Sequence, residues 1–312
     1  MNWLGDSFGV PGGSDLLNVT DGKATFLAAT EPYKDFIKWL HELYTEGLLD
    51  ESGFSQTADQ YQAKLTSDPE IVGVASVWEI GDNFATYDAY DHYVYMDSLT
   101  GLNGKEPTPY YNPYDGNVGM WAVTSACENP EVAVRVADYF YDEEISTEFF
   151  EGRRGEPDEV GEDTQVRQVP CTECDSDTAY MVADPPEGVN TQTFRNKCCP
   201  ASNFPYFCST EGYEKYQHLH YTDKKAEKIE VIKEISPDPI GKLNYTEDEA
   251  EIVNQVQADI ITYANRRAAE WVMNGKIDEE WDSYLQELKN MRLDEMMGVV
   301  QAAQDRFEEN LG

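Results

Sequence analysis

Apolar residues follow two different periods near the start of the chain. Residues 16–29 hold two short apolar runs around Asp21-Gly22. Both of these residues tolerate a positive φ, so the pattern predicts a β-hairpin. From about 31 to 48 the apolar positions recur at helical spacing, with Pro32 in the first turn and Gly47 at the end, which predicts an amphipathic helix. A shorter, more polar helix is predicted over 55–67.

The middle of the chain alternates between short apolar runs and loop-forming sequence. The runs at 71–78 and 118–124 are typical of buried strands, and 92–96 is a weaker strand candidate. Gly and Pro make 98–117 a loop. Asn129, Pro130 and Glu131 have the features of a helix start. One face of that helix is apolar and comprises Val132, Ala133, Val136, Ala137 and Phe140.

The pattern changes again after residue 150. Residues 151–205 are rich in Gly, Pro, Asp, Glu, Thr and Cys and show little periodicity, which predicts irregular structure. From 246 onward three helices are predicted, the first starting at a Thr246–Glu249 capping box and ending at Gly275. Strands and helices alternate early and helices cluster late, so we expect an α/β layered fold with a helical C-terminal portion.

Charge excludes two classes of partner. The chain of 312 residues has 60 Asp and Glu against 23 Lys and Arg, a net charge of −37. Nucleic acid and anionic lipid both need basic partners, so neither is expected. No apolar run reaches the roughly 18 residues of a membrane helix, and the first residues lack the basic and apolar regions of a signal peptide.

Five of the six cysteines lie between 171 and 208. Cys171, Cys174, Cys198 and Cys208 could together supply a zinc site, but their spacing and the adjacent Cys198-Cys199 pair do not fit a standard one. Two disulfides in an exported protein, or free thiols, are the alternatives. We therefore expect neither a metal nor a cofactor.

Catalytic motifs are absent, whereas aromatic residues are informative. With 60 carboxylates, no acidic pair stands out as a general acid and base. Trp78 ends one apolar run just before Asp82, and Trp121 follows Asn117 in another. Rings beside short polar side chains are typical of sugar sites, because the ring stacks on the sugar face while the polar groups bind its hydroxyls. The alternative is that both tryptophans pack in a core.

Seven segments, in order, resemble one protein family. The sequence YKDFIKWLHELYTEGLLD over 33–50 is similar to a characteristic helix of family 1 extracellular solute-binding proteins, which feed sugars to ABC importers. The resemblance covers roughly 25–160 and 245–312. It continues at 72–74, 129–141, 152–155, 268–275, 281–284 and 301–307.

The resemblance implies a periplasmic-binding-protein-like, two-lobed α/β fold that closes about a hinge. It implies an α/β lobe portion with cleft-facing strands over 1–160, an irregular cysteine-containing insertion over 161–240, and a helical portion over 241–312. Trp78 and Trp121 would stack on the ligand, while Asp82 and Asn117 would hydrogen-bond it. Arg153, in a glycine-bounded loop near the hinge, would either join them or form a surface ion pair.

The implied function is non-catalytic binding of a carbohydrate, expected to be an oligosaccharide, by a monomer that delivers it to an importer permease. Family members are extracellular and anchored through a lipid-modified cysteine. This chain shows neither a signal peptide nor a lipobox and begins well into the family pattern, so we expect a truncated form with an incomplete first lobe. The alternatives are a secreted carbohydrate-active enzyme and a folded fragment with no competent ligand site.

Overall fold

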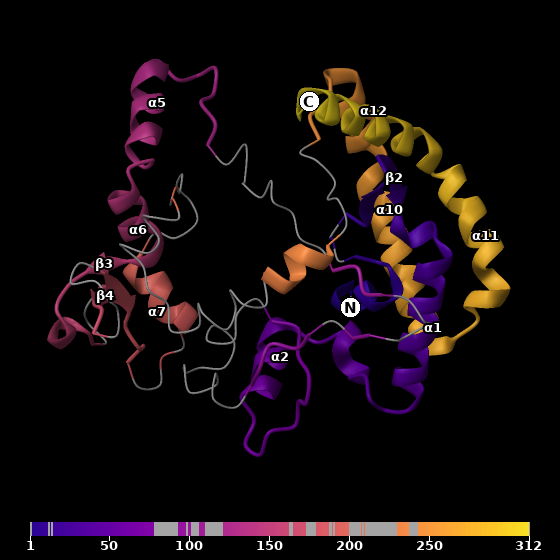
Figure 1. The fold of residues 1–312 in the computed structure, drawn as a ribbon, viewed down its shortest axis with the longest axis horizontal. Coiled ribbons are helices and arrows are strands. Elements are labelled where there is room, and N and C mark those ends of the chain that lie inside the picture. The colour runs from indigo at the N-terminus through magenta and orange to yellow at the C-terminus, as the bar shows by residue number, and fades with distance from the viewer. Residues whose placement is uncertain are drawn as a thin grey trace. The chain divides into compact units, whose positions relative to one another are not determined.

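The computed structural model describes residues 2–11, 13, 15–77, 93–97, 99–100, 106–109, 121–161, 165–172, 179–186, 189, 191–199, 207, 209, 230–236 and 243–311. It divides the chain into two compact units, which we describe separately (Figure 1). The first unit comprises 1–56, 96–115 and 228–312, and the second comprises 57–95 and 116–227.

These units do not follow the predicted segments 1–160, 161–240 and 241–312. The C-terminal helices pack against the N-terminal helix and hairpin, so the two ends of the sequence share one unit. A strand beyond 161 pairs with residues 153–154, so the predicted insertion is not separate from the segment before it. Contacts distant in sequence therefore decide the division.

The first unit is mainly helical. Its named elements are η1 (Asn2–Phe8), β1 (Leu17–Thr20), β2 (Lys23–Phe26), η2 (Leu27–Ala29), α1 (Glu31–Thr45), η3 (Glu51–Phe54), α10 (Glu247–Asn274), α11 (Ile277–Asn290) and α12 (Leu293–Leu311). The predicted hairpin and all four long helices are confirmed. Strands β1 and β2 pair in an antiparallel manner, and the turn residues Asp21 and Gly22 have φ of 50° and 71°.

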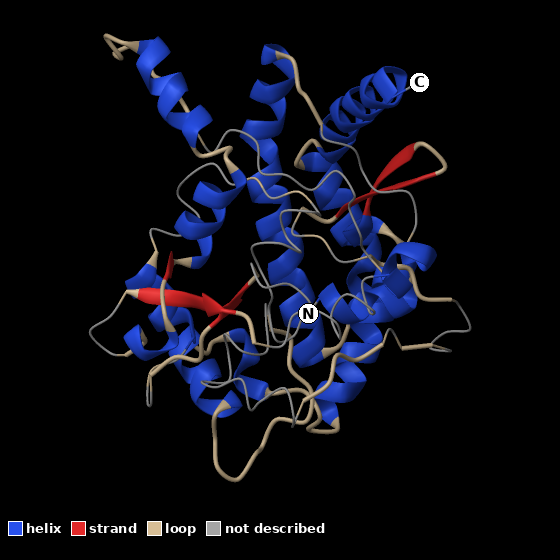
Figure 2. Ribbon diagram, turned by 60° about the vertical axis from the view of Figure 1, so that its left-hand side comes forward, coloured by secondary structure: helices blue, strands red, loops and turns tan. Residues whose placement is uncertain are grey.

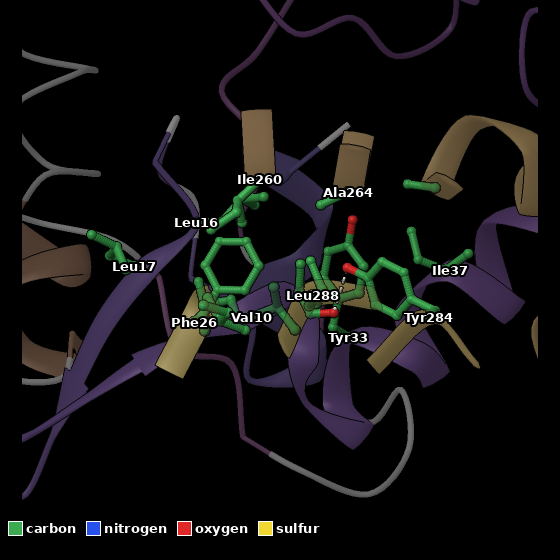
Figure 3. Packing of buried hydrophobic residues seen from close by; sticks show 14 of the residues in the cluster. Val10, Leu16, Leu17, Phe26, Tyr33, Ile37, Ile260, Ala264, Tyr284 and Leu288 are labelled. Atoms are coloured by element: carbon green, nitrogen blue, oxygen red, sulfur yellow. Dashed lines mark hydrogen bonds between the residues drawn. The ribbon is translucent and has the colours of Figure 1, made fainter. Parts of the chain in front are cut away.

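The core of this unit joins helices from both ends of the chain. Helix α10 packs against α1 and α12, and α11 contacts both α1 and α12. Figure 3 shows Tyr33 of α1, Ile260 of α10 and Tyr284 of α11 meeting in one apolar cluster. The Tyr284 hydroxyl donates a hydrogen bond of 3.0 Å to the carbonyl of Ala28, so this buried polar group is satisfied.

The side chain of Gln301 in α12 makes two hydrogen bonds to the hairpin. The Gln301 amide oxygen accepts a hydrogen bond from the Ala24 N–H at 2.8 Å, and its nitrogen donates to the Gly22 carbonyl at 2.8 Å. A two-stranded hairpin alone is marginally stable in water. The Gln301 amide therefore satisfies two backbone groups of the hairpin, as a neighbouring strand would.

The predicted capping box at the start of α10 is confirmed. The Thr246 hydroxyl accepts from the Glu249 N–H at 3.4 Å, and the Glu249 carboxylate accepts from the Thr246 N–H at 2.8 Å. Arg306 of α12 donates to the same carboxylate. The Arg306 guanidinium and the Thr246 N–H lower the pKa of Glu249 to about 2.

The second unit contains a small mixed sheet with short helices. Its named elements are α2 (Ala58–Leu65), α5 (Pro130–Tyr139), α6 (Glu143–Glu151), β3 (Arg153–Arg154), η5 (Pro157–Glu159), β4 (Val166–Pro170), β5 (Tyr180–Val182) and α7 (Thr191–Cys198) (Figure 2). Strand β4 lies between β3, which is parallel to it, and β5, which is antiparallel. Helix α7 packs against β4.

The prediction of irregular structure over 151–205 is wrong for these strands and for α7. The reason lies in β4, where Arg167 and Gln168 are buried together with Val166 and Val169. Polar residues inside a strand remove the alternation of apolar and polar positions by which strands are recognised.

Three predicted strands do not form among the described residues, which are irregular over 71–77, 93–97 and 121–124. Ile71, Val74 and Val94 are 66%, 67% and 85% exposed. A short apolar run becomes a strand only where a neighbouring strand takes up its backbone hydrogen bonds. Trp78, His92 and 118–120 lie outside the described residues.

Helix α5 starts at Pro130 as predicted, but its apolar face is only partly buried. The Asn129 side chain makes no capping hydrogen bond. Ala137 and Phe140 are buried, whereas Val132 and Val136 are 57% and 45% exposed. Among the described helices, none is both long and apolar enough to cross a membrane.

Replacing Glu249 by Gln tests the cap of α10. A carboxylate whose pKa is depressed in the folded state adds stability above its ordinary pKa, and this is lost as pH falls through the folded value. We expect Glu249→Gln to lower Tm at pH 7, and the difference from wild type to shrink as pH falls from 4.5 toward 2. Calorimetry across this range measures it. Glu247→Gln, in the same helical turn, is the control, and equal behaviour of the two variants at every pH would contradict this assignment.

Candidate ligand-binding site

The structure describes two of the five predicted ligand-binding residues. Trp78, Asp82 and Asn117 lie outside the described residues. Trp121 and Arg153 both belong to the second unit, and both are exposed, Trp121 to 38%. Trp121 does not stand at the end of a described strand, so the part of the site that can be built from the structure is the segment around Arg153.

Two glycines fix the course of the backbone on either side of this segment. Gly152 ends α6 with φ of 101°, and a Cβ there would lie 2.8 Å from the Cβ of Arg167. A Cβ at Gly155 would lie 2.7 Å from Cγ2 of Val166. A side chain at either position would force the neighbouring atoms to shift. The two glycines that bound the loop recognised in the sequence are therefore required for steric reasons.

A buried polar network holds the Gly152 end. Arg167 of β4 donates to the Glu151 carbonyl at 2.9 Å and also pairs with the Glu151 carboxylate. Gln168 donates to the Gly152 carbonyl at 2.6 Å. The side chains of Arg167 and Glu151 are both buried. Removing one partner of a buried pair costs about 3–5 kcal/mol, so this network fixes where β3 begins.

Arg154 and Arg153 have different surroundings. The Arg154 guanidinium lies 3.0 Å from the Glu144 carboxylate and 4.8 Å from the ring centre of Tyr180, and its side chain is nearly buried. Successive strand residues point to opposite faces. Arg153 is exposed and forms no ion pair with any described residue, so the surface ion pair that was the alternative to a ligand contact is not seen there. Its guanidinium is free to donate to ligand oxygens.

The cysteines of this unit are in different states. Cys171 is disulfide-bonded, whereas Cys127, Cys198 and Cys199 are free. Burial raises the pKa of the Cys198 thiol to about 11. A zinc ligand must be a thiolate, which a disulfide sulfur cannot supply. Cys174 and Cys208 lie outside the described residues. Among the described residues, no three His, Cys, Asp or Glu side chains form a cluster that could hold a metal ion.

A surface groove of about 260 Å³ lies in the first unit, where α1 meets the junction of α10 and α11. Lys38, Glu42 and Asp278 line it. Trp271 forms part of its floor but is only 1% exposed. A buried ring offers no face for a sugar to stack on, so this groove is not our candidate site.

The chain is homologous to a curated protein from Streptococcus pneumoniae, the fructooligosaccharide ABC transporter substrate-binding protein FusA. The two are 24% identical across 99% of this chain and 56% of that protein. The predicted resemblance to solute-binding proteins of ABC importers is thereby confirmed. The chain spans little more than half the length of this relative. No protein-family model matches the chain.

Solved structures confirm the predicted fold class. The structure of S. pneumoniae FusA in complex with kestose matches 99% of this chain and 61% of that one, with a TM-score of 0.78 and 23% identity. An HMO-binding solute-binding protein from Bifidobacterium longum infantis matches 98% of this chain and 61% of that one, with a TM-score of 0.64 and 20% identity. The chain therefore has a periplasmic-binding-protein-like fold.

Replacing Gly152 by Ala tests how the Arg153 segment is held. The added Cβ meets Arg167, and φ of 101° is strained for any L-residue, so we expect a loss of about 1–3 kcal/mol in the free energy of unfolding. Urea titration measures this loss. Gly73→Ala, in the same unit and with no atom within 4 Å of the new Cβ, is the control. Equal urea midpoints for the two variants would refute the steric role of Gly152.

Proposed function

We propose that this chain binds a carbohydrate without transforming it and serves the permease of an ABC importer. The observation that carries the proposal is the homology to the fructooligosaccharide substrate-binding protein along 99% of this chain. The shared fold with solved sugar-binding proteins supports it. A two-lobed binding protein acts by shifting between open and closed forms. This shift requires that the ligand bind the two forms with different affinities, but it requires no catalytic group.

Trp121 and Arg153 are the described residues that we assign to this function. An exposed indole supplies the apolar face on which a sugar ring stacks. An exposed guanidinium supplies several donors to hydroxyl oxygens, and the support of Gly152 and Gln168 keeps its backbone in place. We propose Trp78, Asp82 and Asn117 as the remaining ligand-binding residues.

The same proposal places the protein outside the cytoplasm as a monomer. The disulfide at Cys171 supports this location, because disulfides persist in oxidising compartments. The free Cys198 is compatible with it, since a thiol whose pKa is raised to about 11 is mostly protonated at neutral pH and reacts slowly.

Isothermal titration calorimetry with kestose, longer fructooligosaccharides and milk oligosaccharides tests the function. We expect at least one oligosaccharide to bind, and Trp121→Ala and Arg153→Ala each to weaken binding at least tenfold, about 1.4 kcal/mol. Phe207→Ala and Arg135→Ala, which remove an exposed ring and an exposed guanidinium elsewhere in the second unit, are matched controls.

The outcomes separate the alternatives. Unchanged affinity in Trp121→Ala and Arg153→Ala would remove these residues from the site. Absence of binding by every oligosaccharide would refute the function for this chain. Chromatography of the sugars after incubation provides the remaining check, because we expect them to be recovered intact, and shortened products would indicate an enzyme.

A further inference from the structure

The disulfide at Cys171 has two candidate partners in this chain. Three of the six cysteines are free, namely Cys127, Cys198 and Cys199. The sulfur of Cys171 is bonded, so its partner is Cys174 or Cys208. Both of these lie outside the described residues, and the choice between them therefore depends on where the described residues beside them are held.

Cys171 extends strand β4 by one residue. Its N–H donates to the Ala179 carbonyl at 2.8 Å, next to the register pair of Pro170 and Tyr180. The backbone of Cys171 therefore belongs to the ladder between β4 and β5. The place where β4 ends in the second unit decides which cysteine the sulfur can reach.

Strand β4 runs back along α6, from the end of the helix toward its start. Arg167, near the start of the strand, donates to the carbonyl of Glu151, the last residue of α6. Gln168 donates to the Thr147 carbonyl at 3.3 Å, one turn earlier in the helix. Each further residue of a strand advances about 3.3 Å. The end of β4 therefore lies toward the first turn of α6.

The contacts of Arg154 give the same direction. Arg154 pairs with Gln168 across the sheet, and its guanidinium lies 3.0 Å from the Glu144 carboxylate in the first turn of α6. The ring of Tyr180 lies 4.8 Å from the same guanidinium, and Tyr180 is the register partner of Pro170. The residue pair just before Cys171 is thus held near the first turn of α6.

Both neighbours of position 208 are bound to the same turn of α6. The Phe207 N–H donates to the Ser146 hydroxyl at 3.1 Å, and the Ser209 N–H donates to the Glu143 carboxylate at 2.7 Å. Consecutive Cα atoms are about 3.8 Å apart, so the residue between these two stays close to this turn. Bonded cysteines need Cα atoms about 4.4–6.8 Å apart. The contacts of β4 and of 207–209 both lead to the turn where such a bond can form.

We propose that Cys171 is bonded to Cys208. The bond is a redox-sensitive brace between the sheet of the second unit and the segment 207–209, and it encloses β5 and α7 in one covalent loop. Helix α7 packs against β4, so this packing and the brace hold the same loop. A disulfide stabilises mainly by restricting the unfolded chain, and by more when the loop is longer. The brace needs no sugar, so it is independent of the proposed function.

A bond to Cys174 fits these contacts less well. It would require the chain to reverse direction within the four residues 171–174, directly after Cys171 leaves the ladder. It would also close a short loop between β4 and β5, two strands that hydrogen bonds already join. Closing so short a loop restricts the unfolded chain little. The two pairings therefore differ both in the covalent link and in the effect of reduction.

Peptide mapping of the wild-type protein tests the pairing directly. Free thiols are alkylated in denaturant, which prevents exchange. Trypsin, with a protease that cleaves after glutamate, then separates the relevant cysteines into peptides 168–173, 174–187 and 198–211. We expect 168–173 to be joined to 198–211 by a disulfide, with alkyl groups on Cys198 and Cys199. Peptide 168–173 joined to 174–187, or recovered with an alkylated Cys171, would overturn the proposal.

Thermal unfolding tests the brace in the folded protein. We expect Cys208→Ser to lower Tm by about 5 °C or more, because the long loop is no longer closed. Cys174→Ser is the matched control, and we expect it to keep the wild-type Tm. A phosphine reductant becomes a phosphine oxide while water supplies the oxygen and the two thiol protons. We expect it to lower Tm in the wild type and in the control but not in Cys208→Ser.

Two results of this experiment would contradict the brace. One is a Tm that falls in Cys174→Ser but not in Cys208→Ser, which would assign the stabilising bond to Cys174. The other is a reductant effect that is the same in the wild type and in Cys208→Ser, because the substitution would then not have removed the bond that the reductant cleaves.

Discussion

Packing of α10 against α1 is the interaction on which the first unit depends. Ile260 and Ala264 of α10 and Phe36 and Leu40 of α1 are almost fully buried in the same cluster. Removal of this apolar surface from water is the main source of stability, and it brings together segments separated by more than 200 residues. Tyr284 and Gln301 then add directional contacts to Ala28 and to the hairpin, at sequence separations of 256 and 277 residues.

The second unit relies on a different kind of contact. The centre of its sheet holds Arg167 and Gln168, whose side chains bind the end of α6 through Glu151 and Gly152. Hydrogen bonds of this kind are directional, so they specify a position more sharply than apolar contacts do. Their effect is to hold Arg154 between Glu144 and Tyr180 while Arg153 stays open to solvent. A structural arginine and a candidate ligand-binding arginine are thus neighbours in sequence.

Exposed apolar surface is distributed unevenly between the units. The long helices of the first unit bury their stripes, whereas Ile71, Val74, Val94, Val132 and Val134 of the second are more than half exposed. The same unit holds Trp121 and Arg153, the described residues that we assign to sugar contacts.

The sequence alone determined the elements whose signals are local. The hairpin at Asp21-Gly22, the starts of α1, α5 and α10, and the helical stripes follow from backbone preferences and spacing. Gly152 and Gly155, on either side of the Arg153 segment, could also be recognised in the sequence. The family resemblance rests on short sequence segments of this kind. Tertiary structure alone decided which apolar runs became strands, because a strand needs a partner for its backbone groups. It also decided the division into units and the surroundings of Arg153, since buried polar pairs such as Glu151–Arg167 leave no periodic trace in the sequence.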